Sequence, residues 1–499
     1  MLVVISDLHL TDGTSGETIS SSAFEIFADA LTDLARSASR RMGGVYRPIE
    51  QINLVLLGDI LDPVRSSRWL QGGSIRPWSN LNTPEAVAFI EKATDDILAH
   101  NDPAMRILRS LSQGAVTVPP ATRAGKPAYN TEEVPVPVRI HYLVGNHDWF
   151  LHLRGAQYHP MRHKVTRQMG LANRADLPFP HDPAEDGELL EAMRRHKVFA
   201  RHGDIFDPFN FNGDREQSSV GDAIVIELLT RFAFQLEQEL GNELPQATLS
   251  GLRELDNVRP LILTPVWLDG LLARSCPFPA MRTKIKQVWD RLADEFLSIG
   301  FIRAQDTWNP ADLIDGLQAT LKFSKVLSIG RASSLIDWYS RLRGSADESY
   351  YRHALTEQEF RNRRAKHVIY GHTHFQESVP LDASHAEGYV LNQLYFNSGT
   401  WRRVHRQTRL SPAEHEFIPS ECMTYLAFFQ GDERGGRPYE SWTGMLGIAP
   451  SDTHYLRLDP GHQAYASQPS VLPSGIPGHG PHFAPSPART GTAARSRLG

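Results

Sequence analysis

Cysteine is almost absent from this chain, which has only Cys276 and Cys422 among its 499 residues. Two cysteines exclude a disulfide framework and a thiolate zinc site, and we expect both to be buried as small hydrophobic residues. An excess of one charge is also lacking, because 52 lysines and arginines nearly balance 57 aspartates and glutamates. The formal charge of −5 therefore gives no general attraction to nucleic acid or to anionic membranes.

Long hydrophobic runs are missing as well. No apolar stretch approaches the roughly 18 residues of a membrane-spanning helix, and no transmembrane segment is predicted. Asp7 already belongs to the first strand-and-turn unit, and no separate apolar segment of the kind that a secretory signal needs precedes it. A composition of 41% hydrophobic and 22% charged residues is typical of a soluble globular protein. We therefore expect a cytoplasmic protein.

What the chain does contain is a series of five short polar motifs. Each follows a short run of β-branched and apolar residues, which is typical of a buried strand. The motifs are Asp7-Leu8-His9, Gly58-Asp59-Ile60-Leu61-Asp62, Gly145-Asn146-His147-Asp148, His202-Gly203-Asp204 and Gly371-His372-Thr373-His374. The apolar runs before them are 2–5, 52–57, 140–144, 198–200 and 368–370. Polar residues at strand ends converge on one edge of a sheet, where α/β folds build their sites.

These residue types suit the hydrolysis of a phosphoester with two metal ions. Water attacks a phosphoester slowly, because it is a poor nucleophile and because the phosphoryl oxygens repel it. Two divalent cations about 3.5–4 Å apart activate water and neutralise the developing charge. Such a site needs a carboxylate that bridges both metals, with neutral imidazoles and oxygens in the other positions. Mixed oxygen and imidazole ligands favour manganese, iron or zinc over calcium.

The motif set resembles that of the calcineurin-like metallophosphoesterase superfamily, whose pattern is D-x-H, G-D-x-x-D, G-N-H-[DE], H and G-H-x-H. The chain carries DLH, GDILD, GNHD, HGD and GHTH in the same order. The resemblance covers residues 1–207 and 366–429. It implies an α/β fold, the four-layer α/β/β/α metallophosphoesterase sandwich. It also implies a metallophosphoesterase that hydrolyses a phosphomonoester, phosphodiester or pyrophosphate bond.

The resemblance further implies a role for each motif residue. One metal ion is expected at Asp7, His9, Asp59 and His374, and a second at Asp59, Asn146, His202 and His372. His147 is expected to protonate the leaving group, and Asp148 to orient and charge that imidazole. Asp62 and Asp204 are expected to accept hydrogen bonds from ligand imidazoles. The implied cofactors are two divalent metal ions, Mn²⁺ first, with Fe or Zn as alternatives.

The motifs divide the chain into a split core and an insert. Residues 1–208 and 366–459 are assigned to the core, and 209–365 to a mainly helical insert. The segment 460–499, rich in proline, glycine and serine, is predicted to be a disordered tail because it cannot bury enough apolar surface. Two roles remain open for the insert: a cap over the site that selects the substrate, or a segment for assembly and stability.

Helices are predicted within the insert from the spacing of apolar residues. Such residues recur at every fourth position from Val220 to Leu240, which is typical of one face of a helix. Further helices are expected at 285–299 and from Asn309 onward, where a capping residue precedes a proline. Arg201 and Arg215 lie on either side of the fourth motif. Both are interpreted as surface residues, with phosphate binding as the alternative.

The motifs differ from those of some branches of the superfamily and resemble those of others. Protein serine/threonine phosphatases carry G-D-x-V-D-R-G and G-N-H-E, whereas here Pro63 follows Asp62 and the third motif ends in Asp148. The segments GNHDWFL and HGD resemble the UDP-diacylglucosamine pyrophosphatase branch, so a nucleotide-sugar pyrophosphatase or a nuclease remains an alternative. A non-catalytic protein-docking scaffold is the alternative of another class, although scaffolds can lose ligands that this chain retains. The expected partner is a phosphorylated substrate, and nucleic acid is not indicated by the charge.

Overall fold

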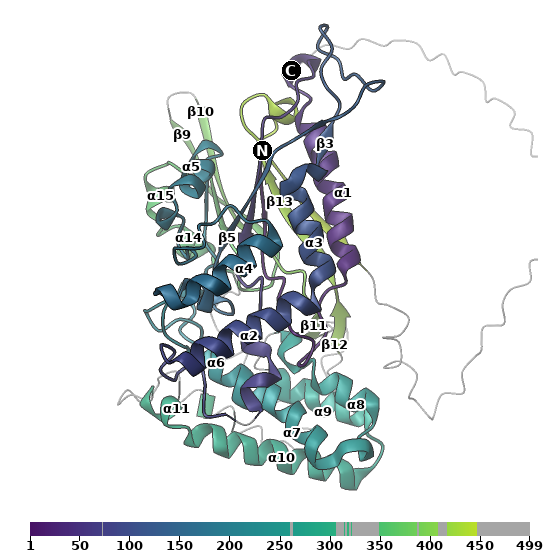
Figure 1. The fold of residues 1–499 in the computed structure, drawn as a ribbon, viewed down its shortest axis with the longest axis vertical. Helices are drawn as coiled ribbons and strands as arrows, with labels where there is room; N and C mark the ends of the chain where they lie inside the picture. Colours follow the sequence, from purple (N-terminus) through teal and green to yellow (C-terminus); the bar gives the residue numbers. More distant parts are fainter. Residues whose placement is uncertain are drawn as a thin grey trace, which may run out of the picture. The chain divides into compact units, whose positions relative to one another are not determined.

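The computed structural model describes residues 1–71, 73–259, 263–305, 314, 317–318, 321, 349–386, 389–407 and 417–446. Within these residues the chain is a mixed α/β protein with several sheets (Figure 1), which confirms the predicted α/β class. No helix in this part of the chain is both long and apolar enough to cross a membrane. The predicted tail at 460–499 and most of the helix predicted from Asn309 lie outside the described residues.

The first three motifs follow neighbouring strands of a five-stranded sheet. In order across this sheet the strands are β14 (Tyr439–Met445), β13 (Cys422–Phe428), β1 (Leu2–Ile5), β2 (Ile52–Leu57) and β5 (Val138–Leu143). Strands β1, β2 and β5 pair in parallel, so their carboxyl ends lie at the same edge. Strands β13 and β14 extend the sheet in antiparallel fashion on the other side of β1.

The last two motifs follow strands of a second, four-stranded sheet. Its order is β6 (Val198–Ala200), β8 (His367–Tyr370), β10 (Tyr389–Asn397) and β9 (Glu377–Ala386). Strands β6, β8 and β10 are parallel, and β9 is antiparallel to β10. All five strands predicted before the motifs are therefore confirmed. Strands β1, β2 and β6 have the predicted bounds, whereas β5 and β8 begin one or two residues earlier than predicted.

Two smaller sheets complete the strand pairing among the described residues. They are formed by β12 (Phe417–Ser420), β11 (Val404–Gln407) and β7 (Val258–Arg259), and by β3 (Thr117–Val118) and β4 (Val134–Pro135). Strand β7 belongs to the insert, and it pairs in parallel with β11 of the core. The insert is therefore joined to the core by backbone hydrogen bonds close to the last motif.

The two faces of the five-stranded sheet are buried against different neighbours, because successive strand residues point to opposite faces. Val3 and Ile5 join a cluster that contains residues of four helices. These helices are α1 (Ser21–Ala38), α2 (Pro84–His100), α3 (Asp102–Ser110) and α4 (His159–Met169). Leu2 and Val4 join another cluster, which includes Ile369 of the second sheet and residues of α5 (Gly187–Arg195).

The second sheet is covered on its other face by short helices. Val368 and Tyr370 of β8 pack in a cluster with Ala354 and Phe360. The latter two residues belong to the helices α14 (Tyr351–Ala354) and α15 (Gln358–Arg361). This face of β8 is therefore buried against α14 and α15.

The insert buries a hydrophobic cluster of its own. Its helices are gathered in one group (Figure 1): α6 (Val220–Ala223), α7 (Arg231–Leu240), α8 (Gln246–Leu252), α9 (Thr264–Ser275), α10 (Pro279–Ser298) and α11 (Gly300–Ala304). The cluster includes Phe232, Trp289 and Phe296, and also Cys276. Cys276 is buried as predicted, whereas Cys422 is only half-buried. The insert and the core nevertheless belong to one packed unit.

The stripe from Val220 to Leu240 is helical, but not as one α-helix. A π-helical segment, Ile224–Thr230, lies between α6 and α7. A spacing of four residues exceeds the 3.6 residues of an α-helical turn, so apolar residues at this spacing would move gradually around the surface of an α-helix. The wider turns of a π-helix compensate for this drift. All residues of the segment are buried, and Ile226 packs into the core cluster.

We predict that the insert is stabilised by its own cluster. Phe296 is fully buried, whereas Phe278, at the other end of α10, is 63% exposed. Phe296→Ala should lower the free energy of unfolding by about 3–5 kcal/mol, because it leaves a cavity. Phe278→Ala should change it by no more than about 0.5 kcal/mol. Denaturant unfolding of both variants measures this difference, and equal effects would contradict the burial of Phe296.

Candidate metal centre

The ends of the motif strands bring the seven predicted ligands together. Their carboxylate and imidazole atoms form two groups, each within 4.8 Å: Asp7, His9 and His374, and Asp59, His202 and His372. Asn146 joins the second group, with its Oδ1 3.0 Å from Nδ1 of His372. Asp59 Oδ2 lies 3.7 Å from Nε2 of His9 and 3.2 Å from Nε2 of His202. Asp59 therefore lies between the groups, as expected of a bridging carboxylate.

Backbone strain is concentrated at these residues. A residue with a side chain rarely adopts positive φ, and each instance costs on the order of 1–3 kcal/mol. Eight non-glycine residues in the described part of the chain do so. Five of them are predicted ligands, with φ between 46° and 66°: Asp7, His9, Asp59, His372 and His374. Strain of this kind is typical of functional sites.

Two motif glycines are required by the approach of the carboxylates. A Cβ atom at Gly145 would clash with Oδ1 of Asp59 and with the ring of His202. A Cβ atom at Gly371 would clash with Oδ2 of Asp7. The glycines that precede Asn146 and His372 are therefore needed for close packing, apart from any role in a turn.

Hydrogen bonds to outer partners orient two of the ligand imidazoles, His202 and His372, toward the centre. Nδ1 of His202 lies 2.9 Å from the carbonyl oxygen of Leu57, so it donates outward and turns Nε2 toward the centre. That Nε2 faces Asp59 without the alignment of a hydrogen bond. Nε2 of His372 lies 3.0 Å from Oδ2 of Asp207, which turns Nδ1 toward Oδ1 of Asn146, 3.0 Å away. An outer partner on one ring nitrogen is the arrangement found at metal-binding histidines.

The third and fourth imidazoles share a hydrogen bond. Nδ1 of His9 lies 2.9 Å from Oδ2 of Asp62, as predicted for Asp62, and Nε2 of His9 lies 2.9 Å from Nε2 of His374. Nη2 of Arg259 lies 3.1 Å from Nδ1 of His374. A guanidinium only donates, so the proton of His374 is on Nε2 and is given to His9. Nε2 of His374 could bind a metal ion only after Arg259 no longer donates to Nδ1, because the proton on Nε2 must first be lost or move to Nδ1.

The protonation states fit a cation site. Burial lowers the pKa of His9 to about 4. Burial, and then the charge of Arg259, lowers the pKa of His374 well below its usual value. Burial would raise the pKa of Asp59, but His202 and His147 hold it well below its usual value. Two neutral imidazoles thus lie beside an ionised carboxylate, which is what metal binding requires. Together with Asp7 and Asn146, this donor set fits manganese, iron or zinc.

The carboxylate that orients His147 is Asp62. Its Oδ1 lies 2.8 Å from Nδ1 of His147, while its Oδ2 contacts His9. Asp148 was predicted for this role, and that prediction is wrong. Its oxygens instead accept hydrogen bonds from the backbone N–H groups of Gly145 and Ile60 and from the hydroxyl of Tyr142. Asp148 therefore fixes the backbone of the second and third motifs at Ile60 and Gly145.

His147 is held as a charged imidazolium. Burial disfavours its charged form, but Asp62 and Asp59 raise its pKa to about 9. Its backbone N–H also donates to Oδ1 of Asp59 at 2.8 Å. The ring is therefore anchored at Nδ1 and protonated at neutral pH, with Nε2 on the side away from Asp62.

The surroundings of the fourth motif differ from the prediction. Asp204 does not bond a ligand imidazole; it pairs with Nη2 of Arg215 at 2.6 Å. Arg215 is not at the surface: it is buried, and its Nη1 lies 3.2 Å from the carbonyl oxygen of Gly145. The partner of His372 is Asp207, which sequence reasoning missed. Its only signal was an acidic residue in the loop after the motif.

Comparison with protein-family models finds no match for this chain, and a search of curated proteins finds none either. The motif pattern and the geometry of the centre therefore carry the functional argument.

We predict that Asp62 supports metal binding and that Asp148 does not do so directly. Asp62→Asn removes the charge and leaves a single acceptor oxygen for His9 and His147, and it should weaken affinity for a divalent cation by roughly 10–100-fold. Asp148→Asn, at an equally buried position, is the matched control and should lower stability instead. Titration calorimetry with Mn²⁺ and thermal unfolding separate the two effects. A larger loss of affinity in Asp148→Asn would contradict this assignment.

Proposed function

We propose that this chain is a metal-dependent phosphoester hydrolase of the calcineurin-like metallophosphoesterase superfamily, working with two divalent cations. The observation that carries the proposal is the meeting of seven predicted ligands in two groups with Asp59 between them. The sequence of helices, sheet, sheet and helices through the core supports the four-layer sandwich that the resemblance implies. We include that architecture in the proposal.

Each group of residues would hold one cation. Asp7, His9 and His374 would bind one, and Asn146, His202 and His372 the other, with Asp59 shared. Bound there, the cations would lower the pKa of a water molecule and offset the charge of the phosphoryl oxygens. Manganese is the first candidate, with iron or zinc as alternatives for the same donor set.

His147 is placed to act on the leaving group. Asp62 fixes the ring through Nδ1, and the carboxylates of Asp62 and Asp59 keep it protonated. Its Nε2–H can then give its proton to the oxygen that leaves phosphorus. Overall, the water oxygen bonds to phosphorus, the phosphorus–oxygen ester bond breaks, and the leaving oxygen takes up a proton.

The insert contacts the centre, which favours a cap that selects the substrate over a segment that serves only assembly and stability. Arg259, in β7 of the insert, donates to His374. A segment that reaches a ligand can contact the remote part of a substrate, and such contacts convert binding energy into selectivity. The retention of all seven ligands and of His147 favours an enzyme over a protein-docking scaffold on the same fold.

We predict that hydrolysis of an artificial phosphodiester requires Asp59. Asp59→Asn keeps the shape of the side chain but removes the charge shared by both cations, so turnover should fall to the background rate. Asp176→Asn, at an exposed ion pair with Arg174, is the control and should retain full turnover. Activity assays with Mn²⁺ and after chelation measure this. Undiminished turnover of Asp59→Asn, or of wild-type protein treated with chelator, would contradict the two-cation mechanism.

We further predict that the effect of His147 depends on the leaving group. Positioned acid catalysis is worth about 10²–10⁴-fold, so His147→Ala should lower turnover by this factor for an alkyl ester. The loss should be much smaller for a nitrophenyl ester, because its leaving group needs little protonation. Metal content should stay near that of the wild type. Equal losses for both esters would favour a positioning role over an acid role.

A further inference from the structure

Three arginines from separate parts of the chain lie around Asp256, and one of them, Arg259, also contacts His374. Arg65 follows the second motif, Arg402 follows β10, and Arg259 ends β7 of the insert. Arg65 and Arg402 are 1% and 3% exposed, and Arg259 is half-buried. Because the three come from the core and the insert alike, the cluster exists only when the two are packed together.

Two of these arginines share a single carboxylate. Oδ2 of Asp256 lies 2.7 Å from Nη2 of Arg402 and 3.3 Å from Nε of Arg65. Nη1 of Arg65, and Nε and Nη1 of Arg402, are buried without a hydrogen-bond partner among the described residues. A second buried acid, Glu254, is placed 3.5 Å from Nε2 of His405. The donors of Arg65 and Arg402 therefore exceed the acceptors around them.

Arg259 makes only neutral contacts within the described structure. Its Nη1 donates to the backbone carbonyl oxygens of Asp256 and Val258, and its Nη2 donates to Nδ1 of His374. An imidazole nitrogen is a weaker partner for a guanidinium than an anionic oxygen. An anion that entered here would improve the hydrogen bonding of Arg259.

Among the described residues, Asp256 is the one carboxylate that forms ion pairs with arginines of this cluster. Burial, and then the charge of Arg402, lowers the pKa of Arg65. Burial lowers the pKa of Arg259 to about 10, with Arg402 and Arg65 contributing to the decrease. A buried charge without a partner is costly. Because the two buried arginines share one carboxylate and keep N–H groups without a partner among the described residues, an anionic ligand would stabilise the cluster.

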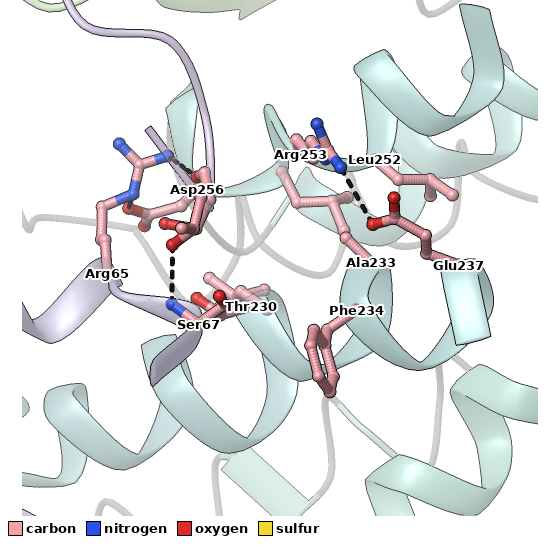
Figure 2. Close-up of a pocket in the computed structure, with 13 residues that line it drawn as sticks. Arg65, Ser67, Thr230, Ala233, Phe234, Glu237, Leu252, Arg253 and Asp256 are labelled. Carbon is pink, nitrogen blue, oxygen red and sulfur yellow. Dashed lines mark hydrogen bonds and ion pairs between the residues drawn. The ribbon is translucent and has the colours of Figure 1, made fainter. Parts of the chain in front are cut away.

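The cluster adjoins both the proposed metal centre and the proposed acid. The charges of Arg259 and Arg402 help to lower the pKa of His374, and Asp256 helps to raise that of His147. Arg65 and Asp256 also line a pocket formed by core and insert residues. Figure 2 shows these two side chains at one end of the pocket and the ion pair of Arg253 with Glu237 at the other. Of the three arginines, Arg65 is the one that lines this pocket.

We propose that Arg65, Arg259 and Arg402 bind a second phosphate group of the substrate while the first lies at the metal centre; this rests on the proposed hydrolase function. The planar fork of a guanidinium matches two phosphate oxygens at once. The cluster would therefore favour substrates with two neighbouring phosphate groups, such as diphosphates, over those with a single isolated phosphate.

The first test measures binding without metal and thus without hydrolysis. Full-length protein treated with chelator is titrated calorimetrically with inorganic phosphate. Arg259→Gln should bind roughly 10–100-fold more weakly than the wild type, and Arg259→Lys, which keeps the charge but loses the fork, should lie between them. Arg253→Gln, the matched control from the same pocket, should bind as the wild type does. An unchanged affinity in both Arg259 variants, or an equal loss in Arg253→Gln, overturns the subsite.

The second test addresses the preference for two phosphate groups. Manganese-loaded protein is titrated with methylenediphosphonate and with methylphosphonate, neither of which it can hydrolyse. The wild type should bind the diphosphonate more tightly, and Arg259→Gln should reduce this preference by roughly 10–100-fold. Equal affinities for the two probes in the wild type overturn the preference. Failure to bind manganese at all sinks the hydrolase proposal, while the metal-free titration still decides whether the arginines bind phosphate.

Discussion

The buried carboxylate of Asp59 is the constraint on which the centre depends. One of its oxygens faces both His9 and His202, and the other accepts the backbone N–H of His147. A charge buried this deeply requires compensation by nearby positive charge. In the structure the compensation comes from His202, whose pKa is raised well above its usual value by Asp59 and Asp7 against the effect of burial. Divalent cations at the same place would supply that charge without the protons.

Much of the centre could be predicted because its determinants are local in sequence. Each ligand directly follows an apolar run, and parallel pairing of β1, β2 and β5, and of β6, β8 and β10, carries the ends of those runs to common edges. The glycines of the motifs identify places where a ligand of another motif packs against the backbone. The seven residues that the structure brings together are therefore those that spacing and residue types, together with the family resemblance, indicated as ligands.

Other parts of the centre could not be predicted because they depend on contacts between distant segments. Asp148 is adjacent to His147 in sequence, but the loop turns its side chain toward backbone donors, and Asp62 contacts the ring instead. Arg259 lies in an insert without any recognisable motif, yet strand pairing of β7 with β11 brings it to His374. Neither residue type nor spacing indicates such contacts, since they arise only when segments that are distant in sequence pack together.

The most direct measurement of the central claim is anomalous diffraction from crystals of the protein soaked with Mn²⁺. The account predicts two peaks about 3.5–4 Å apart, both within coordination distance of Asp59. One peak should be bounded by Asp7, His9 and His374, and the other by Asn146, His202 and His372. A single peak away from Asp59, or no peak at this strand edge at saturating Mn²⁺, would contradict it.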